Sequence, residues 1–126
     1  MAHGSDGNPL ARHGGISYLE LPARDRERSA AFYEQTLGWQ IDRRPNGDWR
    51  FSGDGGQFIG RFALDRAIGR EPGILPYIYV AGLDAAVARA TAAGGEVVKA
   101  PYTEGDTRVA TVRDPAGNVI GLWQFA

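Results

Sequence analysis

The sequence predicts an α+β fold built from two copies of one βαβββ module. Each half shows the order strand, helix, strand, strand, strand, and residues 65–74 form a linker between the halves. Asp25 and Asp84, the expected helix caps, repeat at the same spacing as Leu21 and Val80, which end the preceding strands. Packing two such modules side by side predicts a curved mixed sheet with a concave cavity, with the helices on the outside.

The first module is predicted to span about residues 14–64. Alternating apolar residues at 16–21 predict a strand. Asp25 is a typical N-cap for a helix over 26–37, and Gly38 is a typical stop. Three further strands are expected over 39–44, 49–53 and 57–64, with turns at 45–48 and 54–56.

The second module is predicted over about residues 75–126. Its first strand is expected at 75–80. Leu83 and Asp84 fit a hydrophobic staple and an N-cap for a helix over 85–93, which two glycines then end. The remaining strands are expected at 96–100, 107–114 and 119–125, with residues 101–106 as a loop.

Composition narrows the classes of protein that the chain can form. Its 126 residues suffice for a single domain over 14–126, preceded by a flexible leader at 1–13. A net charge of −1 gives no general attraction to nucleic acid or to an anionic membrane. The absence of cysteine excludes disulfides, thiolate metal sites and cysteine nucleophiles. With neither a membrane span nor a signal-peptide core in the sequence, we expect a cytoplasmic protein.

Two stretches resemble a known family. "ISYLELPARDRERSAAFYEQTLGWQ" and "VATVRDPAGNVIGLWQ", within the βαβββ repeat, resemble the vicinal oxygen chelate superfamily. That superfamily includes glyoxalase I, the bleomycin-resistance proteins and extradiol dioxygenases, and the resemblance covers about residues 14–126. It implies a divalent metal in the concave cavity of the enzymes and, in antibiotic-sequestering members, a homodimer whose shared clefts hold the drug.

The positions that would hold this metal carry no suitable side chains. The resemblance places the ligands on the first and last strands of each half, at Ile16, Gly60, Leu75 and Gly121. Catalytic metal centres need oxygen, nitrogen or sulfur donors from the protein. We therefore expect no metal and no other cofactor.

The concave cavity is predicted to be aromatic. Side chains alternate along a strand, so Tyr18, Glu20, Tyr77 and Tyr79 are expected to point inward. Glycines at 60 and 121 would widen its centre, and the polar segment 102–108 corresponds to a loop at the cavity rim in family members. The predicted ligand-binding residues are Tyr18, Glu20, Phe58, Tyr77, Tyr79, Tyr102, Arg108 and Trp123. The alternative is that these aromatic side chains form packed core.

Glu20 is the one carboxylate expected on this inner face. It would form a salt bridge with Arg61, Arg108 or Arg113, or it would act as a general base or ligand anchor. The favoured function is metal-free binding of an aromatic or apolar metabolite or antibiotic by a homodimer. The alternative is a metal-independent isomerase, cyclase or lyase with Glu20 as its catalytic base. A metal-dependent glyoxalase or dioxygenase is disfavoured by the four ligand positions.

Overall fold

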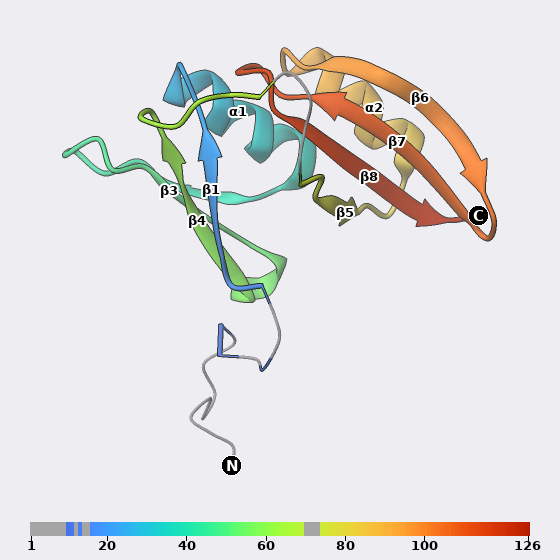
Figure 1. The fold of residues 1–126 in the computed structure, drawn as a ribbon, viewed down its shortest axis with the longest axis horizontal. Helices are drawn as coiled ribbons and strands as arrows, with labels where there is room; N and C mark the ends of the chain where they lie inside the picture. Colours follow the sequence, from blue (N-terminus) through green and yellow to red (C-terminus); the bar gives the residue numbers. More distant parts are fainter. Residues whose placement is uncertain (1–9, 12, 14–15, 70–73) are drawn as a thin grey trace.

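The computed structural model describes residues 10–11, 13, 16–69 and 74–126, and it contains the βαβββ module twice (Figure 1). Most of the predicted leader lies outside these residues. The first module comprises β1 (Tyr18–Pro22), α1 (Arg26–Leu37), β2 (Gln40–Asp42), β3 (Arg50–Gly53), the short 3-10 turn η1 (Asp54–Gly56) and β4 (Phe58–Ala63). The second comprises β5 (Tyr77–Tyr79), α2 (Leu83–Ala92), β6 (Glu96–Glu104), β7 (Thr107–Arg113) and β8 (Val119–Phe125). The predicted α+β class is confirmed.

Hydrogen bonding gives each module its own four-stranded mixed sheet. The strand order is β1-β4-β3-β2 in the first sheet and β5-β8-β7-β6 in the second. In both sheets the first strand of the module runs parallel to the last strand, and the other pairs are antiparallel. The repeat seen in the sequence is therefore a repeat of topology.

Helix α1 has the bounds that its capping residues predict. The Asp25 side chain accepts a hydrogen bond from the backbone N–H of Arg28, at 3.2 Å. Gly38 adopts a left-handed conformation, with φ of 73°, and its N–H donates to the carbonyl of Glu34 at 3.0 Å. Glycine reaches this conformation without the steric cost that a Cβ brings, which ends the helix here.

Helix α2 begins two residues before the expected position, so the assignment of Asp84 as its N-cap is wrong. The N-cap is Gly82, which has no side chain to accept a hydrogen bond. The side-chain carbonyl of Gln124, on β8, instead accepts from the backbone N–H of Leu83 at 2.6 Å. Because this cap comes from a strand distant in sequence, local pattern could not reveal it.

Strand β6 runs through the stretch that was expected to be a rim loop. It extends to Glu104 and forms a hairpin with β7, with register shifts between Val97 and Lys99 and between Lys99 and Tyr102. Pro101 lies within β6, although a proline in a central strand would remove a hydrogen bond of the sheet. β6 is an edge strand, so the missing N–H of proline need not remove a ladder hydrogen bond.

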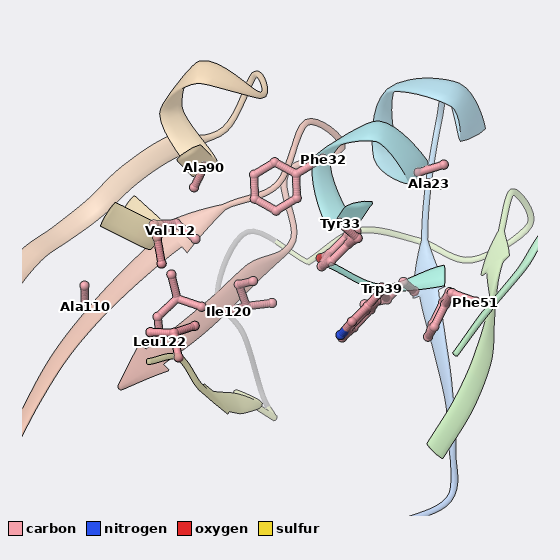
Figure 2. Close-up of a cluster of buried hydrophobic side chains, with 14 of the residues drawn as sticks. Ala23, Phe32, Tyr33, Trp39, Phe51, Ala90, Ala110, Val112, Ile120 and Leu122 are labelled. Atoms are coloured by element: carbon pink, nitrogen blue, oxygen red, sulfur yellow. The ribbon is translucent and has the colours of Figure 1, made fainter. Parts of the chain in front are cut away.

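The core lies between the two sheets and is centred on α1 (Figure 2). Tyr33 stacks on Trp39, with ring centroids 4.8 Å apart, and Trp39 stacks on Phe51 at 4.9 Å. Phe32, from the same helix, faces the second module, where Gly95 leaves room for its ring. One helix therefore supplies core to both modules.

A buried hydrogen-bond network ties the modules together. The Tyr33 hydroxyl donates to the Asp114 carboxylate at 2.9 Å, and the Asn118 side-chain amide donates to the carbonyl of Pro22 at 2.6 Å. Burial raises the pKa of Asp114, although hydrogen bonds from Asn118, Tyr33 and backbone N–H groups act in the opposite direction. The Asp-Pro-Ala-Gly-Asn turn is thus a junction between the modules.

Candidate ligand-binding site

The face of the first sheet that points away from the helices is lined by charge. Glu20 accepts hydrogen bonds from Arg61 at 2.9 Å and from Arg66 at 2.5 Å. Tyr18 shares this face, because side chains alternate along β1 while Leu19 and Leu21 pack into the core. Arg50, on β3, pairs with Asp48 in the segment that precedes this strand. This surface is an ion-pair network rather than an aromatic wall.

The ion pairs of Glu20 favour its ionised form. A base on an apolar wall would have a raised pKa, whereas the hydrogen bonds from Arg61 and Arg66 lower the pKa of Glu20. The salt bridge with Arg61 is confirmed, and Arg66 is a second partner that the sequence reading did not include. A carboxylate held ionised in this way is poorly suited to proton abstraction near neutral pH.

The corresponding face of the second sheet is aromatic. Tyr79, Trp123 and Phe125 form a cluster, with Trp123 5.1 Å from each of the other two rings. Tyr77 covers Gly121 on the neighbouring strand, where a Cβ would collide with the tyrosine ring. Tyr77, Tyr79 and Phe125 are 52%, 54% and 64% exposed. These three side chains are therefore more than half exposed in the described part of the chain.

The sequence predicted that Gly60 and Gly121 widen a common cavity, but the two glycines lie on opposite kinds of face. Gly60 lies on the helix side of its sheet, where a Cβ would meet the backbone carbonyl of Leu19 and the ring of Phe51. The parallel pairs Tyr18–Ile59 and Tyr77–Gly121 are equivalent in the two modules. Ile59 is therefore the counterpart of Gly121, and placing Gly60 on the inner face was wrong by one residue.

Two predicted ligand contacts lie away from the aromatic cluster. Arg108 points to the helix side of β7 and pairs with Asp84 in the first turn of α2, at 3.2 and 3.3 Å. Tyr102 lies on the edge strand β6, with the Lys99 ammonium 3.9 Å from its ring centroid. In the hairpin that replaces the expected loop, Tyr102 pairs with Val109 and Thr103 pairs with Arg108, so the Tyr102 and Arg108 side chains lie on opposite faces of the sheet.

A cavity of about 1060 Å³ lies between the modules. Its walls come from the C-terminal end of α1, the segment between β2 and β4, β5 and α2. Three of the eight predicted ligand-binding residues line it, namely Phe58, Tyr77 and Tyr79. Trp39 and Arg89 also line the cavity, and neither was among the ligand-binding residues predicted from the sequence. We call this space the intermodule cavity.

Phe58 reaches the intermodule cavity from an unexpected side. It was expected to share the concave face with Tyr18, but it packs on the helix side against Trp39 and Phe51, with ring centroids 5.1 and 6.3 Å away. Gly53 makes this packing possible, because a Cβ there would lie 2.7 Å from Nε1 of Trp39 and 3.0 Å from Phe58. The cavity wall therefore continues the aromatic core.

Comparison with known proteins identifies the family. The model of the Glyoxalase/Bleomycin resistance protein/Dioxygenase superfamily matches residues 15–122. The chain belongs to this superfamily. CFP32, a candidate glyoxylase of Mycobacterium tuberculosis, is 29% identical over 122 residues, which make up 90% of this chain and 46% of that protein. The chain thus spans about half the length of that superfamily relative.

Solved structures share the superfamily fold. A glyoxalase/bleomycin resistance protein/dioxygenase family enzyme from Burkholderia phytofirmans PsJN is 26% identical, with a TM-score of 0.69, and the match covers 87% of this chain and 98% of that one. TnmS3, an antibiotic binding protein from Streptomyces sp. CB03234, is also 26% identical, with a TM-score of 0.66 over 89% and 96% of the two chains. The match therefore extends to an antibiotic-binding member.

The residues of this chain do not fit the metal that the superfamily's enzymes imply. With Ile59 in place of Gly60, the four positions carry Ile16, Ile59, Leu75 and Gly121, and none offers a donor atom on its side chain. Among the described residues, no three His, Cys, Asp or Glu side chains lie close enough together to hold a metal ion.

No helix of the described chain is long and apolar enough to cross a membrane.

Proposed function

We propose that this chain is a small-molecule-binding protein that takes a planar, largely apolar ligand in the intermodule cavity. The observation that carries this proposal is the aromatic wall made by Trp39, Phe58, Tyr77 and Tyr79 around a space of about 1060 Å³. Ligand pockets in proteins are typically about 300–1,000 Å³ and are lined mainly by apolar and aromatic side chains. The volume therefore suits a molecule of a few fused rings.

The relationship to TnmS3 supports this function. That protein is named as antibiotic-binding, and it matches nearly the whole of this chain. Binding requires no reactive side chain, which agrees with a cavity wall that combines four aromatic rings with polar groups.

A matched pair of variants tests where the ligand binds. Phe58→Ala removes a ring from the wall of the intermodule cavity, whereas Phe125→Ala removes one from the aromatic face of the second sheet. We expect isothermal titration calorimetry with 2-naphthamide to show weaker binding for Phe58→Ala and unchanged binding for Phe125→Ala. Thermal melts establish that both variants are folded. The opposite pattern would move the site to the second sheet and overturn its placement in the cavity.

We also propose that binding is independent of metal. The support is the chemistry of Ile16, Ile59, Leu75 and Gly121, which provide no ligand atoms from their side chains. Elemental analysis of protein purified without a polyhistidine tag is expected to give far less than one metal ion per chain. One equivalent of nickel, zinc, iron or manganese that survives dialysis would contradict this proposal.

We propose a homodimer in which a second copy covers the aromatic face of the second sheet. The rings of Trp123 and Phe125 lie on this face outside the intermodule cavity, and Phe125 is 64% exposed. The open face of the first sheet carries Arg50 and Arg61. A two-fold axis can bring each aromatic face against the arginine-bearing face of the partner, and arginine packs favourably on aromatic rings.

A further inference from the structure

Arg89 is an exposed cation on the wall of the intermodule cavity, and no described carboxylate pairs with it. It lies on α2 and lines the cavity. Its one hydrogen bond among the described residues goes from Nη2 to the backbone carbonyl of Thr36, at a long 3.4 Å. A guanidinium group carries five N–H donors in a planar fork. Most of the hydrogen-bonding capacity of Arg89 is therefore unused by the described chain.

The other charged residue on the cavity wall cannot neutralise Arg89, because it is already paired. Glu34 accepts two hydrogen bonds from Arg43, both at 2.8 Å, and these bonds lower the pKa of Glu34. Glu27 is a further partner of Arg43. Glu34 thus stays ionised in its ion pair with Arg43. The guanidinium of Arg89 is therefore available to pair with an anionic ligand in the cavity.

Trp39 adds an aromatic ring to the same wall. It is 7% exposed, and its ring stacks on Tyr33 and on Phe51. Figure 2 shows the indole nitrogen pointing away from Phe51. Gly53 packs close to this nitrogen, because a Cβ at that position would lie 2.7 Å from it. The ring of Trp39 is therefore held in place by its neighbours, and its edge on the cavity can pack against an aromatic ligand.

From these observations we propose that the ligand of the intermodule cavity is an aromatic acid. Its ring lies against Trp39 and Phe58, and its carboxylate pairs with the guanidinium of Arg89. Arginine suits this role because its planar fork can donate two parallel hydrogen bonds to one carboxylate. The inference rests on the proposed function, since it specifies the chemical class of the molecule that this cavity binds.

Two probes with the same ring system test the carboxylate. 2-Naphthoate is charged and 2-naphthamide is neutral, and each is titrated calorimetrically into the full chain at neutral pH. We expect naphthoate to bind roughly tenfold more tightly, as a charge-assisted hydrogen bond would give. Arg89→Gln is expected to abolish that preference. Arg28→Gln is the matched control, because Arg28 is an exposed arginine on α1 outside the cavity.

The outcomes separate this inference from the proposed function. If both probes bind with equal affinity, the aromatic-acid assignment is overturned and the binding function stands. If naphthoate keeps its preference in Arg89→Gln, another cation selects the acid and the role of Arg89 is overturned. If neither probe binds to the folded wild-type chain, both proposals fail. Loss of the preference in Arg89→Gln alone supports the inference.

Discussion

The ring of Tyr77 lies over the α-carbon of Gly121 on the adjacent parallel strand. This contact explains why an apolar strand has a bare backbone at its centre. Any side chain at that position would occupy the space of the tyrosine ring. Gly121 therefore serves packing between β5 and β8, and Tyr77 in turn contributes to the wall of the intermodule cavity.

We predict that Gly121→Leu destabilises the protein by about 1–3 kcal/mol, the usual range for overpacking. The added side chain must displace Tyr77, whose half-exposed ring can move aside. Combining it with Tyr77→Ala is expected to recover most of the loss, and urea denaturation of the four proteins of this double-mutant cycle measures the coupling. Additive losses without coupling would show that Tyr77 is not the obstacle.

The hydroxyl of Tyr33 is predicted to stabilise the junction between the modules. Tyr33→Phe leaves the buried carboxylate of Asp114 with one donor fewer, and we expect a loss of about 1–2 kcal/mol in the free energy of unfolding. Tyr102→Phe is the control, since the Tyr102 hydroxyl makes no hydrogen bond within the described chain. Equal stability of the two variants in urea would argue against a tie through Tyr33.

Glu20 is predicted to make stability depend on pH in the acid range. Its pKa is lowered from an ordinary value of 4.5 by Arg61 and Arg66, so the folded state binds protons more weakly than the unfolded chain. The contribution of these ion pairs is present above about pH 4.5 and is lost as the pH falls through the lowered pKa. In Glu20→Gln, the free energy of unfolding should vary less with pH over this range. An identical acid limb in both proteins would refute the assignment.

The same Glu20→Gln variant separates binding from acid–base chemistry. Glu20 lies on the charged face of the first sheet and is not part of the cavity wall. We therefore expect unchanged affinity for 2-naphthamide. A large loss of affinity would place the ligand on the face of the first sheet that carries Glu20, as the sequence predicted.

Light scattering tests the proposed homodimer. We predict the mass of two chains at micromolar concentration for the wild type, because association would bury the exposed ring of Phe125. Phe125→Asp places a charge in that apolar face and should shift the equilibrium toward single chains. Phe58→Asp is not a suitable control, since Phe58 is part of the core. A wild-type mass of one chain throughout this range would contradict the dimer.

The fold was predictable because its signals are local. Asp25 and Gly38 mark the two ends of α1, and the alternation of apolar residues marks β1. The predicted start of α2 was wrong, because the side chain that caps this helix belongs to Gln124, which is distant in the sequence. The hairpin through Pro101 was mistaken because the tolerance of an edge strand for proline depends on its place in the sheet.

The candidate site was only partly predictable from the sequence. Alternation placed Tyr77 and Tyr79 correctly on one face of β5, but a shift of one residue put Phe58 and Gly60 on the wrong side of β4. Trp39 and Arg89 carry no local signal of a cavity, because they come together only through packing of the two modules. The three-dimensional positions of these residues, rather than their types, determine which of them line the cavity.

The three tryptophans allow the most direct test of binding in the intermodule cavity. Trp39 lines the cavity, Trp123 lies on the aromatic face of the second sheet, and Trp49 lies outside it, close to the guanidinium groups of Arg26 and Arg43. Each indole N–H gives its own signal in a ¹⁵N–¹H correlation spectrum, assigned through Trp→Phe variants. During titration with 2-naphthoate, the Trp39 signal should move and saturate at one ligand per chain, while Trp49 stays unchanged. Movement of Trp123 with a stationary Trp39 signal would contradict the account.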